Sequence, residues 1–426
     1  MADAGPTDKT SWIDRYITAF RYRDFLLVWI GSLSGSSSYW GLIVARGVLV
    51  LDITDSAASV GIVTFAAMAP RFVVPPFAGY LADRFTRRSV LIGSYAANML
   101  LGVALTVLVF MGDIQVWQLM LLSTLNGAAR TFQMTATQAL VPNLIPRPVL
   151  MNAVALNYAT VHGTRLIGPG LLVPLMLLAN PGYAFLGATM FYVVGLIFVL
   201  GIRTRSSGGI QKGQSLSAGM GEAIVHVYRN PDLRMLFLLI ALHCSLTMSF
   251  ESILPIYSRD VIDAGGAGVS YLMMGVGSGA LVAVLIIAGI RTEWAKGRML
   301  LAMGVISGVS LLGLALAPNL PLAVLSAAVM GGSQSGFMAI SNSMVQSLSP
   351  DTLRGRISGL NQINVGGTMA AVNLGNGFLA DAKGPEMALY ILGTTFMVVM
   401  LLSLGGATLR KVYSAGTPQM QTAASG

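Results

Sequence analysis

The sequence predicts an all-α membrane protein with twelve transmembrane helices in two pseudo-symmetric six-helix bundles. The composition is the first reason, because 54% of the 426 residues are hydrophobic and only 10% are charged, whereas soluble domains carry about 25% charged residues. The second is the recurrence of apolar stretches of roughly 20 residues, which is the length that crosses a bilayer as a helix. The third is a short pattern that occurs once in each half of the chain.

Twelve apolar stretches follow one another along the chain. The predicted spans are 25–50, 58–79, 89–110, 116–141, 152–178, 183–202, 235–258, 268–290, 299–317, 321–347, 357–380 and 386–409. We therefore expect an N-terminal bundle over 25–202 and a C-terminal bundle over 235–409, flanked by a cytoplasmic segment over 1–24 and a cytoplasmic tail over 410–426.

One polar interruption, 203–234, separates the two predicted bundles. Its Ser/Gly-rich opening, Ser206 to Gly209, is typical of a flexible cytoplasmic linker. The stretch from Glu222 to Arg234 then predicts a short amphipathic helix on the membrane surface.

The basic residues fall on one side of this layout. Of the 26 Lys and Arg residues, 20 lie in loops and termini on one side, whereas only Arg259 and Lys383 lie on the other. Because basic loops stay in the cytoplasm, we expect both termini there, in a bacterial inner membrane. Topology therefore explains the net charge of +9 better than nucleic-acid binding does.

The N-terminus and the cysteine content bound the class of protein further. The first twenty residues are polar, so we expect no removable signal peptide. The single cysteine, Cys244, excludes an internal disulfide.

The pattern that repeats is Leu156-Asn157-x-x-x-Val161-x-Gly163-Thr164. It recurs as Leu360-Asn361-x-x-x-Val365-x-Gly367-Thr368. Both copies open the fifth predicted helix of a half. Repeats at equivalent places indicate two parallel halves with a substrate site near the bilayer midplane between them.

A charged turn joins the second and third spans. The stretch from Gly79 to Arg88, GYLADRFTRR, holds one acid and three arginines. This turn resembles the signature loop of the major facilitator superfamily, with Thr86 at the place of a usual glycine. The resemblance implies the twelve-helix major facilitator fold. It also implies that Asp83 caps the helix beginning near Ile357, with Arg84, Arg87 and Arg88 bracing it, as a cytoplasmic gate.

The resemblance runs from Phe25 to Leu409. It looks closest to the branch with the enterobactin exporter and related drug exporters, the transmembrane secretion effectors. The stretches that carry it are Leu51 to Ala57, Ala139 to Pro142, Arg165 to Gly170, Glu251 to Pro255 and Leu353 to Arg356. The Gly168-Pro169 pair resembles an antiporter motif and implies export against proton entry. The chain departs from many relatives at Ser37-Ser38-Tyr39, where they carry an acid, and at Thr135-Ala136-Thr137, where they carry Pro-Ala-Arg.

Glu251 is the only carboxylate deep in a predicted span. Ionisable groups in a span each cost at least about 2.5–3.5 kcal/mol and usually serve a function. We predict that Glu251 is the protonation switch, with His243 and Thr247 on the same face of a continuous helix. The alternatives are a fixed salt bridge of Glu251 with Arg46, and a packing role for His243.

Four arginines also lie within predicted spans, and the N-terminal half has no acid beside them. Arg130 shares a helix face with Asn126, Gln133 and Thr137, which we expect to face the central cavity. Arginine forks suit carboxylate or catecholate oxygens, so the pattern predicts an anionic substrate. In the alternative, Arg71 and Arg165 bind carbonyls at broken helix ends. The predicted substrate-binding set is Tyr39, Arg46, Arg71, Asn126, Arg130, Tyr158, His162, Arg165 and Thr247.

These observations favour a proton-coupled antiporter that exports an amphipathic, anionic organic compound such as a siderophore or a drug. The alternative is a proton symporter that imports an organic anion. An enzyme is disfavoured, because the sequence has no metal-ligand cluster, no nucleophile-base set and no phosphate loop. We expect no cofactor other than the proton gradient, no metal and no nucleic acid. The expected partners are the substrate, protons and membrane lipids, and the expected state is a monomer.

Overall fold

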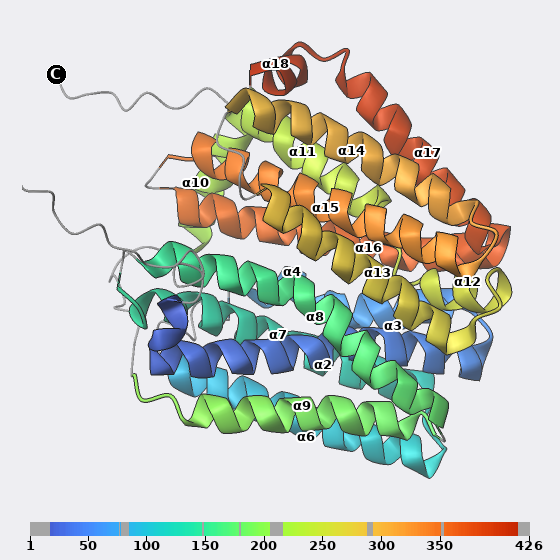
Figure 1. Ribbon diagram of the computed structural model, residues 1–426. Coiled ribbons are helices and arrows are strands. Elements are labelled where there is room, and N and C mark those ends of the chain that lie inside the picture. The colour runs from blue at the N-terminus through green and yellow to red at the C-terminus, as the bar shows by residue number, and fades with distance from the viewer. Residues whose placement is uncertain are drawn as a thin grey trace, which may run out of the picture.

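The computed structural model describes residues 18–75, 77, 85–146, 149–178, 180–204, 216–287, 293–350 and 353–415. Helices account for the regular elements over these ranges, and most of them run side by side along the molecule (Figure 1). Within these ranges six helical segments are long and apolar enough to cross a membrane: Arg87–Met111, Gly182–Leu200, Gly265–Val284, Ala295–Ala315, Leu320–Leu348 and Pro385–Ser403. The described residues therefore confirm the predicted class, an all-α membrane protein.

The helices of the first half are packed around α2. They are α2 (Arg23–Thr54), α3 (Ala57–Met68), α4 (Pro70–Val73), α6 (Arg87–Met111), α7 (Val116–Leu140), α8 (Leu150–Leu178) and α9 (Gly182–Leu200), with the 3-10 turns η1 (Thr18–Arg21) and η2 (Val141–Asn143). Helix α2 packs on α8 and α9, and α6 packs on α7 and α9. The side chains of Ser56 and Thr86 accept hydrogen bonds from backbone N–H groups three residues on, which fixes the starts of α3 and α6.

The helices of the second half are packed around α15. They are α11 (Pro231–Leu246), α12 (Leu254–Asp260), α13 (Gly265–Ile287), α14 (Glu293–Ala315), α15 (Leu320–Leu348), α16 (Arg354–Lys383) and α17 (Pro385–Ser403). Helix α15 packs on α13 and α14, and α14 packs on α17. The side chains of Asn230 and Asn319 cap α11 and α15, and each is followed at once by the proline or leucine-proline that starts the helix.

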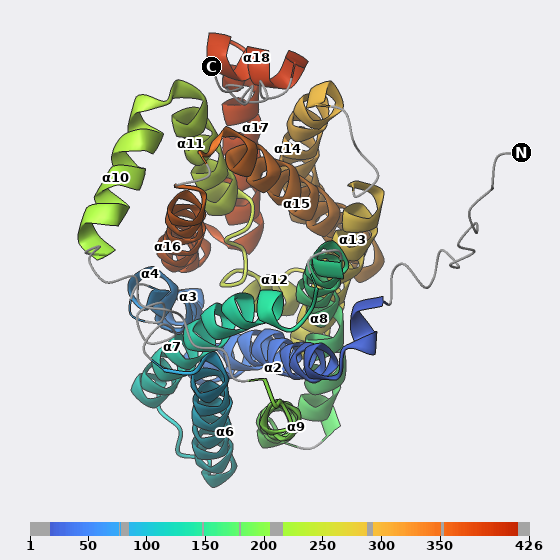
Figure 2. The ribbon, with the colours of Figure 1, turned by 90° about the vertical axis from the view of Figure 1, so that its left-hand side faces the viewer.

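The two halves of the chain occupy two sides of the molecule. Figure 2, a view along the helices, has α2, α6, α7 and α9 on one side and α11, α14, α15 and α17 on the other. Two helix pairs join the halves, because α13 packs against α8 and α16 packs against α3.

The long helices also define two ends of the molecule. Helices α2, α6, α14 and α16 begin at the end on the left of Figure 1, and their first turns contain Arg23, Arg87, Lys296 and Arg354. We call this the basic end, and it is the end that the sequence assigns to the cytoplasm. The other end, where α2 and α16 finish, is called the opposite end.

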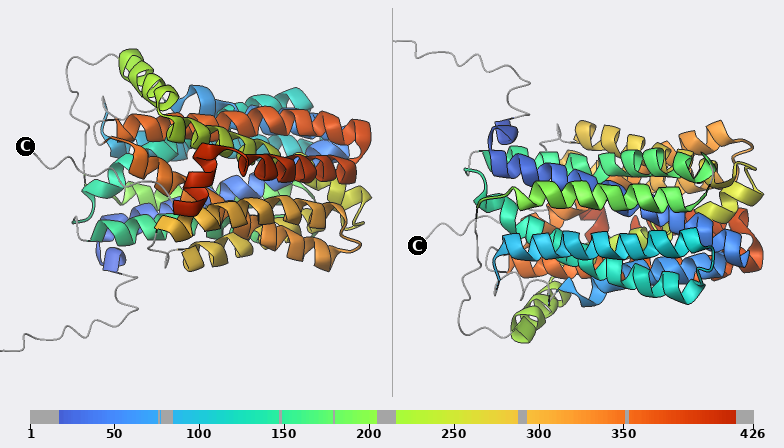
Figure 3. Two further views of the ribbon diagram at one scale, coloured as in Figure 1. Left: turned by 90° about the horizontal axis from the view of Figure 1, so that it is seen from above. Right: turned by 90° about the horizontal axis from the view of Figure 1, so that it is seen from below.

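Two short helices lie across the long ones at the periphery (Figure 3). The predicted amphipathic helix over 222–234 is α10 (Leu216–Arg229), which starts earlier and stops because Asn230 and Pro231 begin α11. An ion pair of 2.8 Å between Arg356 and Glu222 ties α10 to α16. The last predicted span, 386–409, is also wrong at its end, since α17 stops at Ser403 before two glycines and α18 (Ala407–Ala415) follows.

Candidate functional site

A polar cavity of about 500 Å³ lies between the halves near the basic end. Its walls come mainly from α2, α7 and α8, and Gln362 of α16 supplies the wall from the second half. The lining residues are Ser32, Ser36, Arg130, Gln133, Met134, Thr137, Gln138, Val141, Pro142, Asn157, Thr160, Val161 and Gln362. Because Gln138, Pro142 and Gln362 are exposed, the cavity opens at the basic end.

Arg130 is the cation in the wall of this cavity. Its Nη2 donates a hydrogen bond of 2.6 Å to the hydroxyl of Ser36, and its guanidinium carbon lies 5.5 Å from the ring centroid of Tyr39. Gln133, on the same face of α7, donates to the Tyr95 hydroxyl at 2.7 Å. Arg130, Gln133 and Thr137 therefore share the cavity wall, whereas Asn126 lies elsewhere.

Arg71 and Arg165 lie over aromatic rings. The guanidinium carbon of Arg71 is 4.9 Å from the ring centroid of Tyr39, and that of Arg165 is 4.1 Å from the ring of Trp40. Arg130 shares the Tyr39 ring with Arg71. Within the part of the chain that the structure describes, none of these three arginines is in ion-pair contact with a carboxylate. Cation–π contacts thus hold them without neutralising them.

Arg46 and Asn126 form a separate buried network inside the first half. Arg46 Nη2 donates to Asn126 Oδ1 at 3.1 Å, and Asn126 Nδ2 donates to Asn98 Oδ1 at 2.6 Å. Tyr192 adds a longer contact with Asn126, at 3.4 Å. Arg46 is thus paired with an amide. It does not form the alternative salt bridge with Glu251.

Glu251 lies in a break of the seventh predicted span. Helix α11 ends at Leu246 and α12 begins at Leu254, so residues 247–253 are not helical. The expectation that His243, Thr247 and Glu251 share one face of a continuous helix is therefore wrong. The physical reason is Pro255, which lacks the N–H that a continuous helix would bond to the carbonyl of Glu251.

The carboxylate of Glu251 is 5% exposed and accepts a hydrogen bond of 3.0 Å from Asn373 Nδ2 on α16. The positive charges that act on it are those of Arg165 and Arg71. Glu251 thus lies at the junction of the halves, because the Asn373 amide that binds it also contacts Met68 of α3 at 3.9 Å.

His243 and Thr247 lie in the core of the second half. The imidazole of His243 is fully buried and stacks on Phe337 with 3.9 Å between ring centroids. Its Nε2 is 3.2 Å from the hydroxyl of Ser307. Thr247 bonds the carbonyl of His243 with its hydroxyl at 2.8 Å. These contacts are those of packing residues, and they give neither side chain a place in the cavity.

Four predicted site residues fall wholly or partly outside the described part of the chain. Asp83 and Arg84 lie outside the described residues. Tyr158 and His162 lie on α8, but their side chains are not among those described. The remaining gate residues brace helix ends of the first half, because Arg87 donates to the carbonyl of Ala139 at 2.8 Å and Arg88 to that of Leu200 at 3.0 Å.

The opposite end is closed by contacts between the halves that were not predicted from the sequence. Asp381, near the end of α16, accepts hydrogen bonds from Ala57 N at 2.7 Å, Ala58 N at 2.9 Å and Ser56 Oγ at 2.7 Å. These groups are the N-terminus of α3, where the helix dipole favours an anion. A 2.7 Å ion pair between Arg259 and Asp55 lies beside it. We call these two sets of contacts the opposite-end seal.

Arg259 is partly exposed, whereas the acids of this seal, Asp55 and Asp381, are exposed. Hydrogen bonds to the carboxylates of Asp260 and Asp55 raise the pKa of Arg259 above its usual value. A signal for the seal was present in the sequence, since Ser56 is a typical N-cap residue and Asp381 is an acid close to the end of a span that finishes at the same end.

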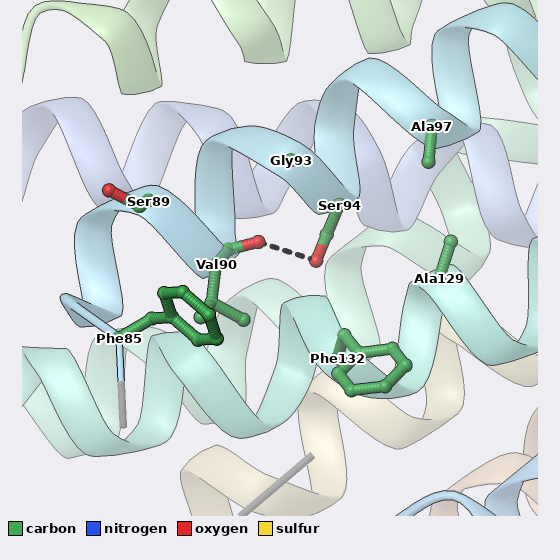
Figure 4. A pocket seen from close by; sticks show the side chains of 8 residues that line it. All are labelled: Phe85, Ser89, Val90, Gly93, Ser94, Ala97, Ala129 and Phe132. Carbon is green, nitrogen blue, oxygen red and sulfur yellow. Dashed lines mark hydrogen bonds between the residues drawn. The ribbon is translucent and has the colours of Figure 1, made fainter. Parts of the chain in front are cut away.

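A second cavity, of about 470 Å³, lies between α6 and α7 (Figure 4). Phe85, Val90 and Phe132 line it together with small residues, and the Ser94 hydroxyl is bonded to the carbonyl of Val90 at 2.7 Å. It offers a charged substrate no cation. The cavity that contains Arg130 is therefore the candidate substrate site.

Comparison with known proteins identifies relatives that are transporters. The chain is 25% identical over 407 residues to the multidrug efflux pump Tap of Mycolicibacterium fortuitum, covering 92% of this chain and 98% of that protein. It is 20% identical over 300 residues to the staphyloferrin A transporter of Staphylococcus aureus, covering 70% and 72%. These relatives are membrane transporters.

A solved structure supports the fold. A POT family transporter in complex with a thioalcohol-conjugated peptide superposes with a TM-score of 0.73 at 14% identity, covering 90% of this chain and 96% of that one. The family described as transmembrane secretion effector matches residues 16–421. This protein therefore belongs to the transmembrane secretion effector family of major facilitator superfamily transporters, and it is a multi-pass membrane protein.

Proposed function

We propose that this protein is a proton-coupled antiporter that exports an amphipathic, anionic organic compound by alternating access. In this proposal the chain crosses the membrane twelve times, and its halves are two six-helix bundles related by the internal repeat. The basic end faces the cytoplasm of a bacterial inner membrane. The cavity open at the basic end and the opposite-end seal then describe an inward-facing state.

The observation that carries the proposal is Arg130 in the wall of the polar cavity. Arg71 lies over the same Tyr39 ring as Arg130, and Arg165 lies over the neighbouring ring of Trp40. The rings of Tyr39 and Trp40 hold the arginines in place but leave their charge and hydrogen-bond donors available to a carboxylate or catecholate. A large apolar body fits the same site, because Met134, Val141 and Val161 are also in its wall.

Glu251 is the proposed proton carrier. It is a buried carboxylate at the junction of the halves, and Arg165 and Arg71 act on it. Buried carboxylates within membrane transporters mark proton routes. Export as the direction is supported by the relationship to an efflux pump.

One feature of the charges favours the alternative, a proton symporter that imports an organic anion. Ionised Glu251 and an anionic substrate would compete for Arg165 and Arg71. Protonation of Glu251 would then strengthen binding of the anion. This is what a symporter requires, because its proton and its substrate must bind together. In an antiporter, protonation must instead weaken substrate binding or prevent it through a change of conformation.

The experiment uses membrane vesicles with a fluorescent carboxylate dye as the probe, beside an uncharged drug of similar size. An antiporter accumulates the dye in everted vesicles with an acidic interior, and a protonophore abolishes the accumulation. Glu251→Gln should stop this proton-driven transport while the purified protein still binds the dye. Full transport by this variant with unchanged pH dependence would overturn the assignment, and dye uptake only by right-side-out vesicles would establish the symporter.

A further inference from the structure

Asn373 is bound on three sides by the broken segment that carries Glu251. Its Nδ2 donates to Glu251 Oε2 at 3.0 Å, and its Oδ1 accepts from Ser252 N at 3.2 Å. The hydroxyl of Ser252 donates to the Asn373 carbonyl at 2.8 Å. Asn373 is fully buried. The carboxylate of Glu251 is therefore attached to α16 through one amide side chain.

The same helix holds the opposite end shut. Asp381 lies eight residues after Asn373, which is about 12 Å along an uninterrupted α-helix. It accepts three hydrogen bonds from the first residues of α3. One continuous helix thus joins the Glu251 contact to the opposite-end seal.

Helix α16 has little freedom to shift against α3 between these two points. A Cβ atom at Gly377 would lie 2.5 Å from the carbonyl oxygen of Ala57, and one at Gly61 would lie 3.1 Å from that of Asn373. Both distances are below ordinary van der Waals contact, so the two backbones touch. A displacement of α16 at Asn373 must therefore be felt at the seal.

We propose that Asn373 is a positioning residue through which the charge of Glu251 sets the strength of the opposite-end seal. This inference rests on the proposed function. An ionised carboxylate accepts a stronger, charge-assisted hydrogen bond than a neutral carboxyl. Ionised Glu251 holds α16 in the place that lets Asp381 cap α3. The empty, deprotonated carrier then stays closed at that end, which prevents it from returning without cargo and leaking protons.

Several groups around Glu251 contribute to its response to pH. The charged groups that act on it are Arg165 of α8 and Arg71 of α4. The phenol of Tyr39 in turn acts on Arg165. Asp381 is itself a carboxylate of the seal. The test therefore removes Glu251, Asn373 and Asp381 one at a time.

The test measures the opening of the seal in the absence of any substrate. Val60 of α3 is 1% exposed, so Val60→Cys in a Cys244→Ala background reports opening when it reacts with a membrane-impermeant maleimide. The full-length protein in right-side-out vesicles is labelled from pH 5 to pH 9, and each rate is divided by the rate for the denatured protein at the same pH, because maleimide reacts with the thiolate. We expect this relative labelling to be slow at high pH and faster, on the order of tenfold, at low pH, as for the loss of one charge-assisted hydrogen bond.

The variants distinguish a specific link from Glu251 to the seal through Asn373 from a general loss of packing around α16. Asn373→Leu and the milder Asn373→Ser should raise labelling at high pH and flatten its dependence on pH, and Glu251→Gln should do the same. Asp381→Asn should raise labelling at every pH but keep the response that arises from Glu251. Asn364→Leu is the matched control, because Asn364 lies on α16 but donates to the Phe237 carbonyl at 3.0 Å within the second half.

The proposal is overturned if both Asn373 variants keep the pH dependence of the parent, or if the Asn364 control loses it. This result does not depend on transport, so dye transport by the same vesicles tests the proposed function separately. If the parent protein transports the dye and Asn373→Leu keeps the parent's pH dependence of labelling, the proposed role of Asn373 is rejected and the proposed function stands. If the Asn373 variants lose the pH dependence of labelling but the parent protein does not transport the dye, the proposed substrate class is rejected and the role of Asn373 stands.

Discussion

The guanidinium carbon of Arg165 on α8 lies 4.1 Å from the ring centroid of Trp40 on α2. Both side chains are more than nine-tenths buried. Trp40 also meets the Tyr39 ring edge to face, with 5.4 Å between centroids, and Tyr39 contacts the guanidinium groups of Arg71 and Arg130. Two adjacent aromatic residues of α2 therefore orient three arginines, none of which is in ion-pair contact with a carboxylate among the described residues.

The first prediction follows from this contact. Trp40→Leu removes the cation–π interaction, worth about 0.5–2 kcal/mol, so we expect the Kd of the carboxylate dye to rise about 2- to 30-fold. Trp40→Phe keeps a ring and should have a smaller effect. Calorimetry on purified protein measures both, with the uncharged drug as the control. Unchanged dye affinity in Trp40→Leu would mean that Arg165 does not meet the substrate.

Arg130 gives the second prediction. Its side chain is in the cavity wall, held by Ser36. Arg130→Ala should weaken dye binding about 10- to 100-fold, the effect of losing a charged hydrogen bond, and should weaken binding of the uncharged drug far less. Arg130→Lys keeps the charge without the planar fork, so its effect should be intermediate.

Ser36→Ala is the control for this series, since it removes the partner of Arg130 but keeps the cation. Equal losses for the charged and the uncharged compound in Arg130→Ala would indicate a structural role instead.

The third prediction concerns Asn126, which the sequence grouped with the substrate-binding residues. Asn126 accepts from the buried Arg46, so Asn126→Leu leaves that charge without its amide partner. We expect a loss of about 1.5–3 kcal/mol in the free energy of unfolding, seen as a lower Tm of the purified protein. Dye affinity of the folded fraction should stay unchanged. The double variant Arg46→Met, Asn126→Leu should recover part of the Tm, because it removes the charge as well.

The helical class and most helix positions were predictable because they depend on local properties. Runs of apolar residues of bilayer length decide where helices form, and caps such as Asn230 and Asn319 decide where they start. The break at residues 247–253 was missed because the stretch 235–258 has the length of one membrane-spanning helix. Its signal was Pro255, which favours a helix start rather than a helix interior.

The site was predictable only in its composition. Counting ionisable residues in apolar stretches identified the arginines and Glu251, since such residues are costly anywhere in a membrane. Their partners come from other helices, and no local pattern indicates that Trp40 meets Arg165 or that Asn126 meets Arg46. The gate predicted at Asp83 stays a prediction, since Asp83 lies outside the described residues. The capping carboxylate of Asp381 at the opposite end was not predicted, because its partners belong to another helix.

The last prediction tests the tight contact between α16 and α3. Gly377 lies against the carbonyl of Ala57, and a side chain there would meet backbone atoms that cannot rotate away. Gly377→Val should therefore separate the two helices at a cost of about 1–3 kcal/mol, which raises the open fraction at the opposite end about 5- to 150-fold. Maleimide labelling of the Val60→Cys reporter measures this opening. Gly375→Val is the matched control, because a Cβ atom at Gly375 would meet nothing within 4 Å. If both valines gave the same labelling, the seal would not depend on the close approach of these backbones.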